Sequence, residues 1–287
     1  MQRLRLSEEP LSRLSVWSRR VALFSIPVVL LSIVIVRSGF LEIMPALAPF
    51  GGALFLAVIA VLLAFASFVV IWREGLQGLG HSLTALLISV LILAYPTFLG
   101  VRGYRLPAIT DVTTDPIDPP TFEAIAKMRA RDANPVAYAG LRAAELQRNA
   151  WPDIETLIVS ASPQDAYEAA VAVMTKRKWR IVDLRPPRVG RPDGHIEAVA
   201  RTPIMGFRDD VVVRIRRSEN GAKIDARSTS RYGVRDFGTN ASRIRSLLED
   251  IDDAASDDST QKKAAMKAAK TANQPPAKGA RPAPTKR

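Results

Sequence analysis

Arg214 and Arg227 are the residues whose type and spacing best suit the binding of an anion. The dipeptide Asn220-Gly221 favours the positive φ values of a two-residue hairpin turn, which would place the two arginines directly opposite each other on one sheet face. Opposed guanidinium groups repel each other unless an anion lies between them, and their forked donors suit phosphate or carboxylate. The pattern therefore predicts an anionic ligand or partner on this face, with Arg231 beside the pair.

The same register supports a second interpretation, in which the face is charged and solvated. Arg216 would face Asp225 and Arg231 would face Asp210, so opposite-charge pairs would flank the two opposed arginines. Exposed ion pairs of this kind contribute little and are common on protein surfaces. The sequence leaves both interpretations open.

A polar cluster surrounds the start of the last predicted helix. Its members are Ser228, Ser230, Arg231, Asp236, Asn240 and Arg243. Asp236 and Asn240 stand where side-chain oxygens satisfy the free N–H groups of a helix start, and Arg243, one turn later, is placed to reach a strand carboxylate. The cluster is therefore either a structural cap and turn or a site that receives a ligand. If the protein is an enzyme, this cluster is its candidate active site.

The composition excludes much familiar enzyme chemistry. The chain of 287 residues has no cysteine and only two histidines, so thiol chemistry is excluded, a zinc site is disfavoured, and His195 is expected to be an ordinary strand residue. Nucleophile elbows, phosphate loops and dinucleotide fingerprints are absent, so we predict no cofactor. A carboxylate mechanism using Asp209, Asp210 or Asp236 stays open, because acid–base pairs have no fixed spacing. We expect a protein that is not an enzyme, with an enzyme as the alternative.

An α+β domain over residues 151–253 is predicted to position these side chains. The predicted strands are 154–160, 179–184, 195–202, 210–217 and 222–231, and the predicted helices are 163–176, with Ser162 as N-cap, and 237–251. The order β-α-β-β-β-β-α indicates an antiparallel sheet covered on one face by two helices. Residues 106–150 precede it as a proline-rich, extended strap and a helix from about 121 to 147, broken near Asn134-Pro135.

Four motifs in this part of the chain resemble the domain-of-unknown-function 1499 family. They are 111–122 (DVTTDPIDPPTF), 147–154 (QRNAWPDI), 206–215 (GFRDDVVVRI) and 227–244 (RSTSRYGVRDFGTNASRI). The resemblance covers about Asp111 to Leu248. It implies a bacterial or plastid protein, often with amino-terminal membrane spans, and implies no established activity.

Three apolar stretches within residues 21–105 predict a three-helix membrane anchor. The second is uncharged between Glu42 and Arg73 and the third between His81 and Arg102, and each is long enough to cross a bilayer. The first, 21–36, is short, but Arg37 can extend toward the headgroups. A signal peptide is the alternative for this segment, and we reject it because no small-residue cleavage site follows.

The distribution of Lys and Arg predicts the orientation. Five arginines precede the first span and Arg73 lies in the second loop, against Arg37, Arg102 and Arg105 on the other side. The segment 1–20 is therefore expected in the cytoplasm. An odd number of spans then exports the domain, which predicts a multi-pass protein of the bacterial inner membrane with a periplasmic domain, part of the cell envelope. With only two spans the domain would be cytoplasmic, and its basic tail would bind anionic lipid or nucleic acid.

A stripe of small residues runs along the second span. It comprises Ala53, Ala57, Ala60, Ala64 and Ser67, which share one helix face. The stripe indicates close helix packing within the chain, with a seam between two copies as the alternative.

The carboxyl-terminal segment 254–287 is predicted to be a disordered basic tail. The net charge of the chain is +12, yet residues 261–287 alone hold eight Lys and Arg and no acid. Alanine, lysine and proline cannot bury enough apolar surface to order such a segment. It suits anionic lipid or polymer or is simply solubilising, and nucleic acid is disfavoured because aromatic residues for base stacking are lacking.

Overall fold

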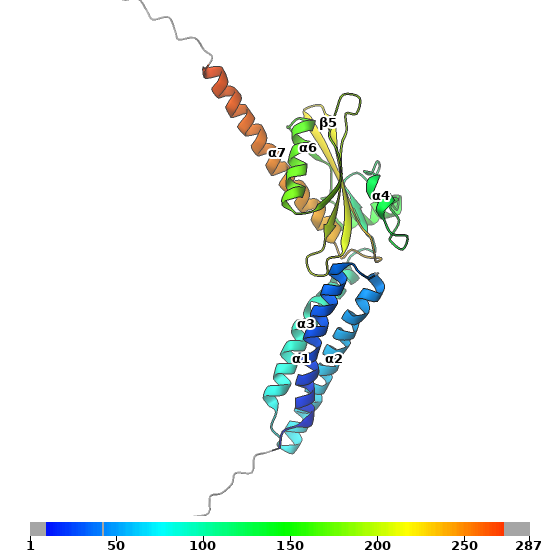
Figure 1. The fold of residues 1–287 in the computed structure, drawn as a ribbon, viewed down its shortest axis with the longest axis vertical. Helices are drawn as coiled ribbons and strands as arrows, with labels where there is room; N and C mark the ends of the chain where they lie inside the picture. Colours follow the sequence, from blue (N-terminus) through cyan, green and yellow to red (C-terminus); the bar gives the residue numbers. More distant parts are fainter. Residues whose placement is uncertain (1–9, 42, 273–287) are drawn as a thin grey trace, which may run out of the picture.

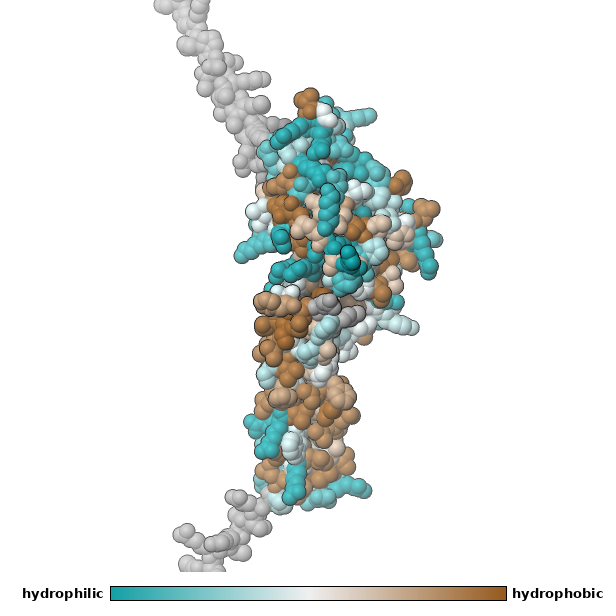
Figure 2. Space-filling model, turned by 45° about the vertical axis from the view of Figure 1, so that its right-hand side comes forward, coloured by the Kyte–Doolittle hydropathy of each residue, from teal (hydrophilic) through white to brown (hydrophobic). Residues whose placement is uncertain are grey.

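Three long apolar helices form one end of the molecule, and a domain of strands and helices forms the other (Figure 1). The computed structural model describes residues 10–41 and 43–272. The helices are α1 (Arg13–Ser38), α2 (Ile43–Glu74) and α3 (Leu79–Arg105), and all three are long and apolar enough to cross a membrane. This confirms the predicted apolar segments. The space-filling view shows hydrophobic side chains around the bundle and a mostly hydrophilic domain (Figure 2).

Small side chains bring the three helices together. The predicted stripe on α2 is fully buried, and its Ala60 and Ala64 pack with Ala22 of α1 and Ala85 of α3. The hydroxyls of Ser67 and Ser82 share a hydrogen bond between α2 and α3. The stripe therefore packs within the chain, as the first interpretation predicted, and a seam between two copies stays a prediction.

The bundle brings the start of α1 and the α2–α3 loop to the end that lies away from the domain. The Ser12 backbone N–H donates to the Gln77 carbonyl over 2.9 Å, and the Gln77 N–H donates to Pro10 over 3.2 Å. Trp17 near the start of α1 and Trp72 near the end of α2 are exposed at this end, whereas Tyr104 near the end of α3 is exposed at the domain end. Amphipathic rings therefore occur near both ends of the apolar bundle, as at the two interfaces of a membrane.

The domain is an antiparallel α+β structure, as predicted. Its strands are β1 (Asp111–Thr113), β2 (Leu157–Val159), β3 (Arg180–Arg185), β4 (Gly194–Arg201), β5 (Arg208–Ser218) and β6 (Gly221–Ser230), and its helices are α4 (Ala124–Met128), α5 (Leu141–Ala150), α6 (Pro163–Lys176) and α7 (Thr239–Ala272). The sheet order is β1-β6-β5-β4-β3, with β2 also paired to β6. The short strand β1 lies inside the segment predicted as an extended strap.

Helices α6 and α7 cover one face of the sheet (Figure 1). Ser162 caps α6 by accepting the Asp165 N–H, which confirms the predicted N-cap. The apolar core lies between these helices and the sheet, and it contains Val211 and Val213 of β5 and Ile244 of α7. This face positions the start of α7 over β6.

Two predicted boundaries are wrong. Residues 129–140 are not helical, because the Arg129 side chain binds the carbonyls of Asn134 and Pro135 and the Asn134 N–H donates to Arg231. Helix α7 continues to Ala272, so 254–272 of the predicted disordered tail is helical. The remainder of that tail, and the amino-terminal residues 1–9, lie outside the described residues.

The predicted hairpin register is also wrong, by two residues. Arg214 lies opposite Asp225, and Arg227 lies opposite Val212, so the two arginines are not opposed. Residues 219–220 form the turn, and Gly221 opens β6 with φ 150°. A Cβ at Gly221 would overlap the Val159 carbonyl of β2, so the glycine is required by strand pairing and not at the centre of the turn.

The second face of the sheet is covered by residues 106–138, which we call the strap. The anion hypothesis required this face to be open to solvent, and it is not. Phe122 and Ile125 pack on Val199 and Val212 of the sheet. The charged face predicted from the hairpin is thus largely an interface between the sheet and residues 111–138.

Arginines fix the domain to the bundle. Arg37 Nη1 donates to two carbonyl oxygens of the β4–β5 loop, those of Pro203 (2.7 Å) and Ile204 (3.0 Å), instead of extending toward headgroups. Arg235 Nη1 donates to the carbonyls of Gly103 (2.8 Å) and Leu106 (2.5 Å) at the end of α3. The domain is therefore held directly against the apolar bundle.

Candidate functional site

Arg227 is buried beneath the strap, with 2 % of its side chain exposed. It forms an ion pair with Asp111 (2.6 Å) and donates to the carbonyls of Pro120 and Val136. Its guanidinium also lies over the rings of Phe122 (5.1 Å) and Tyr138 (5.4 Å). All three nitrogen atoms of its guanidinium therefore donate to groups of the chain itself, and two aromatic rings lie beside it.

The surroundings of this pair shift two pKa values upward. Burial raises the pKa of Asp111, although the Arg227 hydrogen bond and charge oppose that shift. Burial, with the nearby Asp111 charge, raises the pKa of Tyr138 to about 12. The buried ion pair between Asp111 and Arg227 therefore connects β1 and the rest of the strap to β6.

Arg214 and Arg216 hold the acidic part of the strap. Both donate to the carboxylates of Asp118 (3.0 Å each) and Asp115, and both contact Asp225 of β6, at 3.2 Å and 2.7 Å. The predicted anion between arginines is therefore supplied by the protein's own carboxylates. The sequence analysis did not predict this contact. The signal that could have indicated it is the complementary charge of the Asp-rich strap and of Arg214 and Arg216, which alternate along β5.

Arg231 contributes to a third set of ion pairs on this face of the sheet. Its side chain binds Asp210 at 2.7 Å, and Arg129 binds the other Asp210 oxygen, also at 2.7 Å. The predicted contact between Arg231 and Asp210 is confirmed, although it is diagonal because Asp210 pairs with Thr229. No pattern in the sequence indicated the contact of Arg129 with Asp210.

The remaining predicted residues meet on the opposite face, at the start of α7. Asp236 accepts the N–H groups of Gly238 and Asn240, both over 2.9 Å, which confirms its role as a cap. Arg243 reaches Asp209 at 2.5 Å, as the sequence predicted for a strand carboxylate, and also donates to the Ser228 hydroxyl.

Asn240 completes this second group. Its amide donates to the Thr110 carbonyl and the Ser230 hydroxyl, and its oxygen accepts from Ser228 and Arg243. Burial raises the pKa of Asp236 and of Asp209, against the opposing effects of hydrogen bonds and Arg243. The polar groups of Asp209, Ser228, Asn240 and Arg243 therefore bond to one another. Arg231, which was predicted to belong to this cluster, lies on the other face of the sheet.

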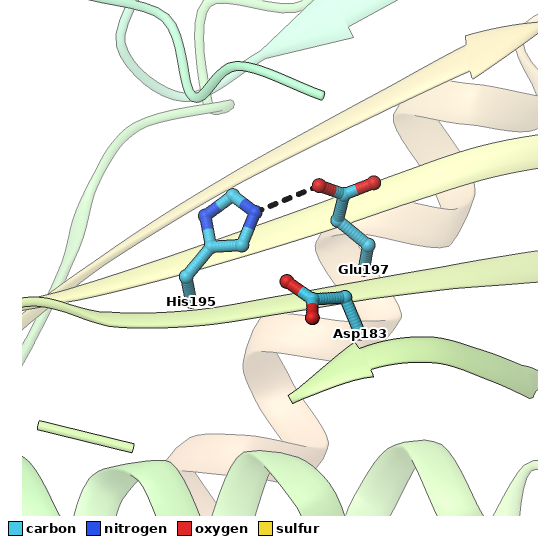
Figure 3. Close-up of side chains that lie close together, drawn as sticks. All are labelled: Asp183, His195 and Glu197. Atoms are coloured by element: carbon cyan, nitrogen blue, oxygen red, sulfur yellow. Dashed lines mark hydrogen bonds and ion pairs between the residues drawn. The ribbon is translucent and has the colours of Figure 1, made fainter. Parts of the chain in front are cut away.

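A carboxylate and histidine cluster on β3 and β4 was not predicted as a site. Figure 3 shows Glu197 bonded to His195, with Asp183 beside them on the neighbouring strand. Their ligand atoms lie within 4.8 Å of one another, as a metal site would require. Glu197 Oε1, however, accepts His195 Nε2 and the N–H groups of Glu123 and Ala124.

The second oxygen of this carboxylate is also occupied, by the Ile125 N–H at 2.7 Å. Burial tends to raise the pKa of Glu197, but these hydrogen bonds outweigh it and hold the pKa at about 2. Asp183 meanwhile pairs with Arg185 at 2.6 Å. The cluster therefore has the chemistry of a carboxylate that caps the start of α4, not of an available metal ligand set.

A cavity of about 450 Å³ lies at the β1 edge of the sheet, and sequence reasoning missed it. Its walls come from 108–111 of the strap, 134–139, helix α5 and the loop after β6. These segments are far apart in the sequence, so no local pattern indicated the cavity. Of the predicted site residues named above, none lines it.

The geometry defines a class of protein: an α+β domain fixed to a bundle of three apolar helices, with ion pairs holding a strap over one sheet face. Residues 111–251 match the family model described as "Protein of unknown function (DUF1499)", so the domain that follows α3 belongs to this family. This confirms the resemblance found in the motifs. No curated protein and no solved structure matches the chain.

Proposed function

We propose that this protein is a multi-pass inner-membrane protein that displays its α+β domain in the periplasm as a binding domain of the cell envelope. The carrying observation is the arrangement of the bundle. The start of α1 and the α2–α3 loop lie at one end, and the domain lies at the other. Three crossings would place the amino terminus and the domain on opposite sides of a bilayer.

The distribution of charge supports the cytoplasmic placement of the amino terminus. Arg13, Arg19, Arg20 and Arg73 lie at the end away from the domain, and Arg3 and Arg5 precede them in the sequence. Short segments rich in arginine are retained in the cytoplasm. At the domain end, Arg37 is engaged by carbonyl groups of the domain.

Binding is favoured over catalysis because the polar groups near the start of α7 are occupied by one another. Asp209 is paired with Arg243, and Asp236 caps the helix, so neither carboxylate is directed at an open space. A general acid or base must reach a substrate proton. The described cavity is bounded instead mostly by apolar side chains.

The absence of cysteine gives a direct test of orientation. We would introduce single cysteines at two exposed positions, Ala126→Cys on α4 and Glu74→Cys at the end of α2. A thiol reagent that crosses the outer but not the inner membrane should label the Ala126→Cys protein in intact cells. It should label the Glu74→Cys protein only after lysis.

The reverse labelling pattern would overturn the periplasmic placement and favour a cytoplasmic domain. Labelling of both positions in intact cells would refute three crossings. The cysteine-free parent protein is the matched control, since it should remain unlabelled throughout. Fusions of alkaline phosphatase and of a fluorescent protein to the carboxyl terminus provide an independent readout of the same face.

A further inference from the structure

The cavity at the β1 edge lies next to the end of the apolar bundle. Its wall begins at Ala108, three residues beyond Arg105 where α3 ends. Three extended residues reach at most about 10 Å. The lining also includes Gly233 and Val234, and the adjacent Arg235 is bonded to the last turn of α3. Both parts of the lining are therefore fixed close to the surface of any membrane the bundle crosses.

The polar groups that border this cavity are already engaged within the protein. The Asn134 amide donates to the carbonyls of Ser230 and Gly233, and the Asp111 carboxylate faces Arg227. The Thr110 carbonyl accepts the Ser230 N–H. A polar ligand would find few unoccupied partners here.

Apolar side chains supply most of the remaining lining. They are Ala108, Ile109, Pro135, Ala137, Ala139, Ala143, Leu146 and Val234. A volume of about 450 Å³ falls in the range of pockets that hold small molecules. Small alanine side chains on several walls leave the space for an apolar chain.

One cation borders the cavity without a partner of opposite charge. Arg142 of α5 is exposed, and among the ion pairs of residues 10–41 and 43–272 it takes part in none. By contrast Arg214, Arg227 and Arg243 of the same domain are all paired with carboxylates. An anionic group at the cavity would meet an available guanidinium.

We propose that this cavity binds a single acyl chain that carries an anionic headgroup, with the chain among the alanines and the headgroup on Arg142. Two sources have this chemistry: a free fatty acid, and an anionic membrane phospholipid with one chain raised into the cavity. The inference deepens the proposed function, because it names the ligand class of the binding domain. It does not depend on which side of the membrane the domain occupies.

The test uses the full chain in lipid nanodiscs, where orientation in the cell has no influence. One arm adds a fatty acid with a photoreactive diazirine in its chain, and the other uses discs containing phosphatidylglycerol with a diazirine in one acyl chain. Labelled residues are mapped by mass spectrometry after irradiation. We expect label in 134–146 beside the label in α1–α3, and the arm that gives it identifies the source.

Two variants and two matched controls decide whether the label reports the cavity. Ala139→Trp fills the space from an exposed position and should abolish labelling of 134–146. Arg142→Glu should lower it about fivefold, the effect of about one basic residue on an anionic lipid. Ala126→Trp on α4 and Arg148→Glu on α5 make the same changes at exposed positions outside the cavity and should leave labelling unchanged.

Equal labelling of 134–146 in all four variants, or label confined to α1–α3 in both arms, would overturn the proposal. Loss of labelling in the Ala126→Trp or Arg148→Glu control would do the same. If Ala139→Trp fails to fold, Arg142→Glu changes only an exposed side chain and still decides the outcome. Cysteine labelling in cells tests the orientation separately, so failure of one proposal is distinguishable from failure of the other.

Discussion

Replacing Glu197 with glutamine should destabilise the domain, because this buried carboxylate caps α4 from the middle of β4. Its two oxygens accept the N–H groups of Glu123, Ala124 and Ile125 over 2.7–3.0 Å, as well as His195 Nε2. A glutamine amide has one acceptor oxygen. Its NH₂ group would face a backbone N–H, leaving a buried donor without a partner.

The pKa of Glu197 sets the magnitude. It is lowered from 4.5 to about 2, and roughly 2.5 pKa units at about 1.4 kcal/mol each correspond to about 3–4 kcal/mol. Because His195 is partly exposed, we expect about 2–3 kcal/mol for the variant at pH 7. The folded-state pKa is depressed, so this stabilisation is present above pH 4.5 and is lost as the pH falls toward 2.

Urea unfolding of the full chain in nanodiscs, followed by tryptophan fluorescence to which the buried Trp151 of the domain contributes, measures this difference. The free energy of unfolding of Glu197→Gln should lie about 2–3 kcal/mol below that of the parent at pH 7, and less than half of this gap should remain near pH 3. Glu219→Gln in the exposed β5–β6 turn is the matched control and should stay near the parent. A gap of the same size at both pH values would refute the role of the charged carboxylate.

Three further outcomes follow from the structure. Arg227→Lys should lower the free energy of unfolding by about 3 kcal/mol in the same urea assay, because lysine cannot replace the forked contact with Asp111; an unchanged midpoint would contradict this role. Ala64→Leu should reduce the thermal stability of the bundle in nanodiscs, whereas the control Val58→Leu, on the exposed side of α2, should not. Equal melting temperatures of the two variants would show that the small-residue stripe is not tightly packed. Zinc should leave the melting temperature unchanged, and a zinc-dependent rise that His195→Ala abolishes would reveal a metal site at Glu197.

Sequence reasoning assigned the hairpin side chains to the correct faces but to the wrong partners. A shift of two residues keeps every side chain on its face, because the side-chain period of a strand is two. The shift arose at Gly221, which was interpreted as part of a two-residue turn. Its positive φ and its close approach to Val159 depend on β2, which lies about sixty residues earlier in the chain. Local turn preferences could not reveal that contact.

The bundle and the helix caps were predictable because their causes are local. Continuous apolar runs define the three helices, and Ser162 and Asp236 bond to N–H groups within four residues. The contacts of the strap with the sheet were not predictable, because they join residues such as Asp111 and Arg227 that are 116 positions apart. For the same reason the partners of Arg214 and Arg227 were not foreseen: Asp118 and Asp111, which bind them, lie in the strap.

The buried ion pairs of the strap are best understood through the cavity that the strap borders. A buried pair contributes little net stability compared with apolar packing, but it strongly penalises any arrangement that separates its partners. Asp111 lines the cavity and is held by Arg227, while Arg129 and Arg231 share Asp210 just behind Asn134. The loop after β6, which also lines the cavity, is tied to α3 through Arg235. These contacts tie the lining segments of the cavity to the sheet and to the end of α3, so displacing them would separate buried ion pairs.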